Sequence, residues 1–343
     1  MSSLPPAMFQ FDDVAAVEVR TDAPFARGFF GDEYAFHRVN IPRIDLPLAV
    51  LDFQLGASAP AGFTRHTHKV LARWAYRIGF QPGRVEISAY GNRFAVPMVH
   101  HMLLHPTLRW LAAGAGTLLL HAGAVVKNGK SVIFTGEGGA GKTTTTSLAL
   151  ASGGWQVHAD DYVFLHPEKS AAISRAYVTR SHLYLNLLRW VPQVAARLTP
   201  WERIRLEFFG RLRAWSGERL KWPVRVAANR LWPDAPVALQ ATPAALVLLE
   251  RGDSPALIAM TDLPGVVETL LQMNFGEARH FLALLEKSEN FDPAWLESWR
   301  ETERGLLTQL TRQISVYRLV LPRSNDAEAV RASLLPALEQ MVA

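Results

Sequence analysis

The stretch Ser131-Val-Ile-Phe-Thr-Gly-Glu-Gly-Gly-Ala-Gly-Lys-Thr143 decides the fold class of this 343-residue chain. Its first five residues are mostly apolar or β-branched, which is typical of a buried strand. Gly136 to Thr143 then fit the pattern G-x-x-x-x-G-K-[ST] at every fixed position, and the residues from Lys142 to about Ser152 are predicted to form a helix. A strand, a glycine-rich loop and a helix in this order predict an α/β fold built around a phosphate-binding loop.

The residue types of this loop suit the binding of ATP. Glycines let successive backbone N–H groups approach the phosphates, and the start of the helix adds partial positive charge. Lys142 is placed to reach the β- and γ-phosphates, and the Thr143 hydroxyl is a hard ligand for Mg²⁺. The alternative is a glycine-rich turn with an exposed lysine. The predicted nucleotide-binding residues are Gly136, Glu137, Gly138, Gly139, Ala140, Gly141, Lys142, Thr143 and Thr144.

Two adjacent carboxylates follow the next predicted strand. Asp160-Asp161 comes directly after the mainly apolar run Trp155 to Ala159. Because the carboxyl ends of strands in an open parallel sheet line the ligand crevice, we expect the pair to face the phosphates. One carboxylate, assigned here to Asp161 together with Thr143, can hold Mg²⁺, and the other can accept the proton of an attacking hydroxyl. Spacing alone does not decide which aspartate is the base. The alternative is a metal-binding carboxylate with a capping neighbour, as in nucleotide hydrolases.

These motifs carry a resemblance to a known family. His121-Ala-Gly123, a hairpin around Asn128-Gly129, the glycine loop, and Gly-Trp-x-x-x-Ala-Asp160-Asp161-Tyr-Val resemble the catalytic core of HPr kinase/phosphorylase. They resemble still more closely the HPr-kinase-like proteins of peptide-modifying gene clusters, such as lasso-peptide kinases. The resemblance implies a P-loop kinase that phosphorylates a serine hydroxyl with ATP and Mg²⁺. It also implies that His121 lies beside the site and that Arg180 stabilises transition-state charge; the alternatives are a buried histidine and a surface arginine.

One departure narrows the implied activity. The bifunctional HPr enzymes carry a Glu-x-Arg-Gly stretch after the acidic pair, and this chain does not. The resemblance therefore favours a dedicated kinase whose acceptor is a serine of a peptide or small protein. A small-molecule kinase on the same core and a P-loop NTPase acting as a regulatory switch are the alternatives. No Asn-Lys-x-Asp motif is present, which argues against a GTPase switch.

The pattern along the chain predicts two domains. Residues 1–106 are expected to form a strand-rich N-terminal domain, and residues 107–343 an HPr-kinase-like P-loop domain. A helix over 97–113, interrupted or restarted by Pro106, is expected to bridge them. Further elements are predicted as a strand at 245–250, helices near 265–287 and 293–312, a strand at 314–321 and a last helix from Asp326.

A basic, tryptophan-rich segment forms a predicted helical insertion at about 183–236. Between Leu183 and Asp234 the sequence holds ten Arg or Lys against four Asp or Glu, a net charge of about +6. Ile204, Phe208, Leu212 and Trp215 keep helical spacing. We expect a peptide or small-protein substrate to dock near 190–232; an anionic membrane surface, nucleic acid as a weaker alternative, and an ordinary amphipathic insertion stay open.

Composition sets the remaining expectations. The chain carries a net charge of +5 and no cysteine, which excludes disulfides and thiolate metal sites. Its N-terminus does not read as a secretory signal, and the apolar run Trp110–Val126 is too rich in Gly and Ala for a membrane span. A cytoplasmic protein is therefore predicted, and homo-oligomer formation is left open. A zinc site is not expected at the histidines, because no acidic ligand lies near them in the sequence. These are His66, His68, His100, His101 and His105.

Overall fold

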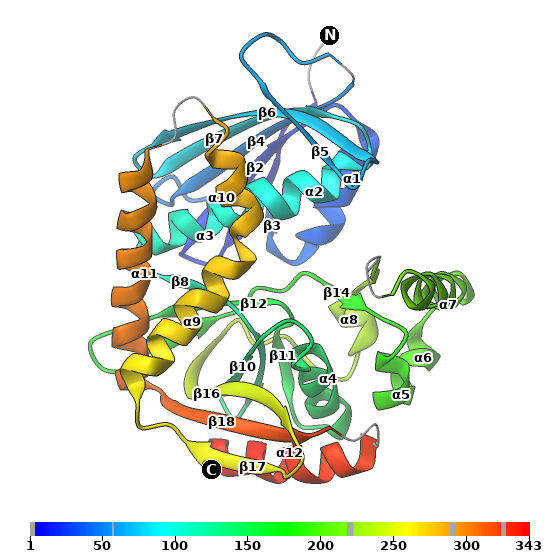
Figure 1. Cartoon of the computed structure of the whole chain (residues 1–343), viewed down its shortest axis with the longest axis vertical. Helices are drawn as coiled ribbons and strands as arrows, with labels where there is room; N and C mark the ends of the chain where they lie inside the picture. The colour runs from blue at the N-terminus through cyan, green and yellow to red at the C-terminus, as the bar shows by residue number, and fades with distance from the viewer. Residues whose placement is uncertain (1–3, 57, 218–221, 289–291, 324–326) are drawn as a thin grey trace. The chain divides into compact units, whose positions relative to one another are not determined.

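The computed structural model describes residues 4–56, 58–217, 222–288, 292–323 and 327–343 (Figure 1). The chain is a mixed α/β protein made of two compact units. One consists of residues 1–119 and 267–309, and the other of residues 120–266 and 310–343. This division differs from the predicted boundary at residue 106, because the helices after residue 263 return part of the chain to the first unit. Such long-range packing leaves no local mark in the sequence.

The first unit contains a mixed sheet with the strand order β3-β1-β2-β4-β7-β6-β5. The three central strands β2, β4 and β7 run parallel to one another, while the pairings on either side of them are antiparallel. The predicted strand-rich stretch also holds the helix α1 (Pro24–Glu33) and a 3₁₀ turn at Ala35–His37. The strands are β1 (Ala7–Phe11), β2 (Ala15–Arg20), β3 (Arg38–Val39), β4 (Leu48–Leu55), β5 (Thr64–His68), β6 (Ala72–Gln81) and β7 (Arg84–Gly91).

The helices of the first unit are joined by a buried ion pair. Arg109 of α3 donates to both carboxylate oxygens of Glu303 on α11, and its guanidinium lies 4.8 Å from the ring of Trp299. Pro106 does not interrupt the predicted helix, because it occupies the first turn of α3, where its missing N–H costs nothing. The helices are α2 (Ala95–Val99), a π-helical turn (His100–Leu104), α3 (His105–Gly114), α9 (Leu263–Glu277), α10 (Arg279–Leu285) and α11 (Pro293–Gln313).

The second unit is built around the strand that enters the glycine loop. β10 lies between β9, to which it is antiparallel, and β16, to which it is parallel; β18 runs parallel to β16 on the far side. Asn128-Gly129 forms the turn of the β9–β10 hairpin, as predicted. The strands are β8 (Leu118–His121), β9 (Gly123–Lys127), β10 (Lys130–Thr135), β11 (Gln156–Ala159), β12 (Tyr162–His166), β13 (Ile173–Arg175), β16 (Gln240–Gly252), β17 (Ala256–Ala259) and β18 (Ser315–Pro322).

Two helices cover one face of this sheet. α4 (Lys142–Ser152) and α12 (Ala327–Val342) pack on the same buried cluster, in which Val132 and Phe134 of β10 meet Leu148 and Leu334. Alternate residues of β10 point to this face, as the period of a strand requires. Figure 1 shows α12 lying along β18. Among the described residues, no helix has both the length and the apolar character needed to cross a bilayer.

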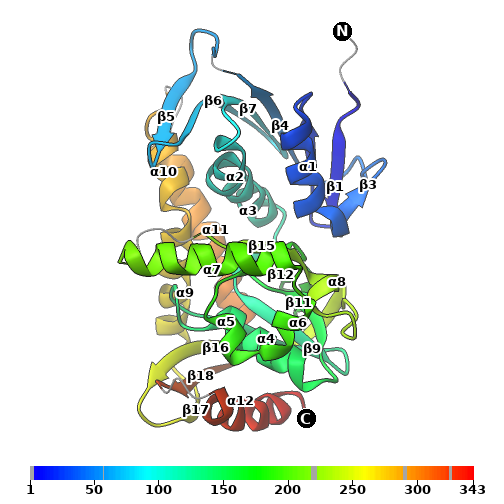
Figure 2. The same ribbon diagram turned by 90° about the vertical axis from the view of Figure 1, so that its right-hand side faces the viewer.

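The basic segment is an excursion between two paired strands. β14 (Arg180–Leu183) pairs antiparallel with β15 (Val224–Ala227), and three helices lie between them in sequence. A Thr199–Glu202 capping box begins the longest of these helices. They are α5 (Leu187–Trp190), α6 (Pro192–Arg197) and α7 (Pro200–Trp215), and α8 (Ala228–Leu231) follows β15. Figure 2 shows α7 along its length.

A close approach at Gly123 joins α4 to the strand that carries the acidic pair. A Cβ atom at Gly123 would lie 2.5 Å from the Thr146 hydroxyl oxygen and 3.2 Å from the carbonyl oxygen of Asp160. Both distances are shorter than ordinary van der Waals contacts. Glycine at this position therefore sets how closely the helix after the loop and the acidic strand can pack.

Gly123→Ala is expected to lower the free energy of unfolding by roughly 1 to 3 kcal/mol, because the added methyl group overpacks this contact. Urea denaturation measures the effect. Gly305→Ala is the control, since an added Cβ there meets open space on an exposed helical position and is expected to stabilise the protein. Equal stability of Gly123→Ala and the wild type would contradict the packing described here.

Candidate functional site

Strand register brings the glycine loop and the acidic pair to one edge of the sheet. Ala124 of β9 pairs with Ile133 on one side and with Ala159 on the other. β10 and β11 therefore run in the same direction with one strand between them, and β10 extends two residues beyond the level at which β11 ends. Since neighbouring strands lie about 4.8 Å apart, Asp160 leaves the sheet roughly 10 Å from the end of β10. The predicted proximity of loop and carboxylates follows from this register.

The loop itself is a tight glycine turn into α4. Gly139 and Gly141 have φ of 94° and 109°, which favour glycine, and Gly141 is the N-cap residue of the helix. Lys142 curls back over the loop and donates a hydrogen bond of 2.7 Å to the carbonyl oxygen of Gly136. The strand, loop and helix thus have the predicted order. Their backbone N–H groups and the lysine ammonium lie at the start of one helix, the arrangement that suits an anion.

Asp161 is held in its charged form by its neighbours. Its Oδ2 lies 2.9 Å from Nδ1 of His182 on β14. Burial alone would raise the pKa of Asp161, but the His182 hydrogen bond and the positive charges of His182, His121 and Lys142 hold it well below its usual range. Burial likewise opposes protonation of His182, yet the bond to Asp161 and both aspartate charges raise the pKa of the imidazole. Asp161 and His182 therefore form an ion pair.

Asp160, unlike Asp161, is disfavoured in its charged form. Burial, and then the charge of Asp161, raise the pKa of Asp160 to about 7, although hydrogen bonds from the Ser181 hydroxyl and the His182 backbone N–H favour the carboxylate. The Oδ2 atom of Asp160 is buried and has no hydrogen-bond partner among the described residues. A carboxylate whose pKa lies near neutral pH and whose second oxygen is unused is suited to accept a proton.

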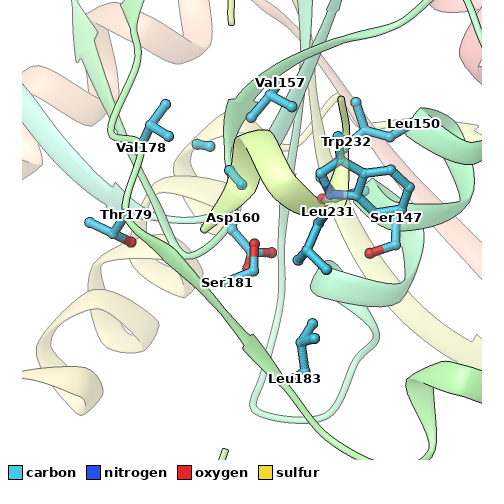
Figure 3. A pocket seen from close by; sticks show the side chains of 13 residues that line it. Ser147, Leu150, Val157, Asp160, Val178, Thr179, Ser181, Leu183, Leu231 and Trp232 are labelled. Atoms are coloured by element: carbon cyan, nitrogen blue, oxygen red, sulfur yellow. The ribbon is translucent and has the colours of Figure 1, made fainter. Parts of the chain in front are cut away.

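A small cavity lies beside Asp160. Figure 3 shows the Asp160 carboxylate next to Ser181, with Leu231, Trp232 and Ser147 on the other side. The centre of a water molecule can move within about 20 Å³ of this cavity, so the cavity has room for one water molecule or one hydroxyl group. Most of its wall is apolar. The apolar part comes from Leu150, Val157, Ala159, Val178, Leu183, Ala228, Leu231 and Trp232. Such a wall explains why the neighbouring carboxyl is hard to ionise.

The two residues named from the family resemblance occupy different places. His121 ends β8; its carbonyl oxygen accepts a 3.2 Å hydrogen bond from Thr135, and its ring lies 5.0 Å from that of Tyr162. The backbone N–H of the next residue, Ala122, donates a 3.0 Å hydrogen bond to the carbonyl oxygen of Asp161, so β8 ends near the acidic pair; a role for His121 there stays a prediction. Arg180 begins β14, two residues before His182, and strand alternation puts the two side chains on the same face.

Sequence reasoning missed Ser181 and His182. Both lie on β14, which pairs with β15 across the whole helical excursion, so their approach to Asp160 and Asp161 is a tertiary contact. The available signal was the cluster of three polar residues Arg180-Ser-His182 between the β-branched pair Val178-Thr179 and Leu183. A strand with a histidine on one face and a serine on the other could have been read as a second wall of the site.

The oxygen-rich donor set fits Mg²⁺ better than a transition metal. The two aspartates and the Thr143 hydroxyl offer hard oxygens, and the unpartnered Oδ2 of Asp160 leaves one of them unused. No group of three or more His, Asp or Glu side chains in the described ranges has the arrangement of a metal site. An ion held here would therefore need further ligands from phosphates or water, which is the usual coordination of Mg²⁺.

Comparisons with known proteins give no match in sequence and a weak likeness in structure. No family model matches the chain, and no curated protein matches it in sequence. Among solved structures, the HPr(Ser) kinase/phosphatase from Coxiella burnetii aligns with 66% of this chain and 99% of its own length. The sequence identity is 14% and the TM-score is 0.31. The chain thus has a weak structural similarity to that kinase/phosphatase.

Asp160→Asn is expected to stabilise the fold above pH 7 by roughly 2 kcal/mol in magnesium-free buffer. The folded pKa of Asp160 is raised to about 7 from 3.8, so the wild type loses stability as the pH rises from about 4 to 7. Asparagine keeps an acceptor for Ser181 and His182 but carries no charge. Urea denaturation between pH 4 and pH 8 measures the difference, which should vanish at the acidic end.

Asp161→Asn is the matched control with the opposite sign. Because the folded pKa of Asp161 is lowered, its charge stabilises the fold above the ordinary aspartate range, and the variant should be less stable than the wild type at pH 7. If both asparagine variants changed stability in the same direction at pH 8, the assignment of opposite states to the two carboxyls would be wrong.

Proposed function

We propose that this chain is an ATP-dependent kinase that transfers the γ-phosphoryl group to a hydroxyl, with a serine of a peptide or small protein as the acceptor. One observation carries the proposal. The buried Oδ2 of Asp160 has no hydrogen-bond partner in the described part of the chain, and it belongs to a carboxyl with a pKa of about 7 at the sheet edge where the glycine loop begins α4. A proton acceptor poised at neutral pH beside a phosphate-binding loop is what hydroxyl phosphorylation requires.

The nucleotide half of the site is the loop. Backbone N–H groups over 136–144 and the Lys142 ammonium bind the phosphates of ATP, and Thr143 with Asp161 holds Mg²⁺. The ion, when bound, neutralises charge on the phosphates. His182 keeps Asp161 ionised for this role through its 2.9 Å contact. His121 supports the same charge from β8, and Arg180 is assigned to the charge that develops on the transferred group.

The acceptor half of the site is Asp160 with its cavity. The acceptor hydroxyl enters the space beside Asp160, whose carboxylate takes the proton as the oxygen attacks the γ-phosphorus. The bond from the γ-phosphorus to the bridging oxygen breaks, and ADP leaves with those electrons. The apolar wall formed by Leu231 and Trp232 keeps bulk water from the reacting oxygen. The use of ATP and the lack of cysteine favour the cytoplasm as the compartment of this reaction.

We assign docking of the acceptor to the segment 190–232, and in particular to α7. Trp201, Ile204, Phe208 and Trp215 are exposed, and at 100° per residue they fall within an arc of roughly 60° opposite the buried Leu206. Arginines at 205 and 211 flank this stripe. An apolar stripe between two cations complements a peptide that carries apolar and acidic residues near its serine.

Contacts within the unit link α7 to the acidic pair. The Arg213 guanidinium lies 5.2 Å from the ring centroid of Tyr184, which directly follows β14. Burial, and then the charge of Asp161, raise the pKa of the Tyr184 hydroxyl, while Arg213 lowers it. Tyr184 therefore lies within electrostatic reach of both the helix and the catalytic carboxylates. This contact joins α7 to the end of β14, the strand that carries His182.

Lys142→Ala and Asp160→Asn are each expected to reduce phosphoryl transfer by several orders of magnitude, because one removes a phosphate contact and the other the proton acceptor. Transfer of ³²P from ATP to a library of serine peptides measures this. Only Lys142→Ala should also weaken ATP binding. Near-normal turnover by Asp160→Asn would refute its role as the base. Fast phosphate release without any peptide, and no transfer to peptides, would favour an NTPase switch.

Replacing Trp201 and Phe208 by serine is expected to raise the KM for acidic serine peptides more than tenfold and to leave the KM for ATP unchanged, because the stripe contacts the acceptor alone. Leu239→Ser removes an equally exposed apolar side chain elsewhere in the unit and is the control. Loss of binding to anionic phosphatidylserine vesicles, with peptide kinetics unchanged, would show that the stripe is instead a membrane surface.

A further inference from the structure

An arginine outside every predicted motif lies against the glycine loop. A Cβ atom at Gly141 would stand 2.7 Å from Nη2 of Arg251, so the guanidinium occupies the space next to the glycine that begins α4. Arg251 lies near the end of β16, the parallel neighbour of β10. Leu249 lies two residues earlier on β16. Its carbonyl oxygen is 2.9 Å from the place that a Cβ atom at Gly136 would occupy. The end of β16 thus lies against the loop at Gly136 and at Gly141.

The charge of Arg251 is not neutralised by any carboxylate of the described residues. No carboxylate in the described part of the chain pairs with it, whereas its neighbours Glu250 and Asp253 are engaged by Arg318 and Arg323 at 4.0 and 3.8 Å. Burial lowers the pKa of Arg251, and among the described residues no acidic group opposes this shift. A half-buried guanidinium without an anion is unfavourable unless a ligand supplies the anion.

Two contacts hold the Arg251 guanidinium in place and leave some of its N–H donors available. Nη1 donates to the carbonyl oxygen of Pro322 at 3.2 Å, and the guanidinium carbon lies 5.7 Å from the ring centroid of Trp190 on α5. Arginine has five N–H donors in a planar fork, so donors remain after the Pro322 contact. Nη2, the nitrogen nearest to Gly141, makes no hydrogen bond to a described residue.

We propose that Arg251 is a second polyphosphate-binding cation, which contacts the phosphates of ATP from the Gly141 side of the loop while Lys142 contacts them from the Gly136 side. This inference rests on the proposed function, since it assigns the polyphosphate of ATP to the same loop. The anion that the guanidinium lacks is then the nucleotide itself. Trp190 and Pro322 position the fork, and the base and ribose play no part in the contact.

Binding of MgATP and of inorganic tripolyphosphate to the full chain, measured by calorimetry, tests the assignment. Arg251→Gln is expected to weaken both ligands by roughly tenfold to a hundredfold, the usual effect of losing a charged hydrogen bond. Arg251→Lys should recover part of the loss, because it restores the charge but not the fork. Arg318→Gln removes the same charge at a surface pair with Glu250 and should bind both ligands as the wild type does.

The possible outcomes distinguish a failure of the proposed kinase function from a failure of the role assigned to Arg251. Wild-type protein that binds neither ligand would overturn the proposed function and this inference together. Wild-type binding that depends on Lys142 but is unchanged in Arg251→Gln would overturn the inference alone. A loss for MgATP without a loss for tripolyphosphate would also overturn it, because the contact would then be to the nucleoside. Thermal unfolding of each variant establishes that a loss of binding is not a loss of fold.

Discussion

Two adjacent carboxylates at the end of one buried strand cannot both be charged without a nearby cation, and the architecture of the site follows from this constraint. His182 neutralises Asp161 at 2.9 Å, and Lys142 and His121 add positive charge around it. Asp160 makes no ion pair of its own: burial and the charge of Asp161 outweigh the more distant charge of His182 and the hydrogen bonds from Ser181 and the His182 backbone, and raise the pKa of Asp160 to about 7. Chemically identical side chains next to each other in sequence therefore take different roles, because one has a cation and the other does not.

The cation that makes this difference is supplied from a distance in sequence. His182 reaches the pair because β14 is held against β15, and the helices α5 to α7 fill the chain between these strands. Whatever orders α7 therefore also bears on the position of His182, and through it on the charge of Asp161. The contact between Arg213 and Tyr184 also joins α7 to the end of β14. This geometry couples the basic segment to the carboxylates by packing rather than by proximity in sequence.

Local patterns predicted the parts of the site that are local. The glycine loop, the Asn128-Gly129 turn and the strand before Asp160 each carry their conformational requirement within a few residues, and the structure has them where they were expected. The level at which β10 and β11 end depends on a register with β9 that the sequence does not state. His182, Ser181 and Arg251 come from other strands, and single polar residues in apolar strands are common for structural reasons. Their roles become visible only through tertiary contacts.

The two compact units of the structure differ from the predicted domains 1–106 and 107–343 for the same physical reason. Residues 267–309 pack as helices with the first unit, where Asn274, Trp299 and Glu303 surround Arg109. This buried arginine has its partners about 165 and 194 positions away, and burying it without them would cost several kcal/mol. The helical periodicity of these segments was visible, but nothing in it says which sheet they cover. Elements could be predicted, and their assignment to units could not.

The size of the cavity beside Asp160 bears on how a kinase of this kind would avoid hydrolysing ATP. A space that admits one hydroxyl admits one water molecule equally well, so its volume cannot discriminate between acceptor and solvent. The apolar wall limits how much water is present but does not select the acceptor. Selection must then come from contacts outside the cavity, where an acceptor has residues to offer and water has none. The exposed stripe of α7 is a surface of that kind, because binding energy gained there can hold a serine in place while a water molecule gains nothing.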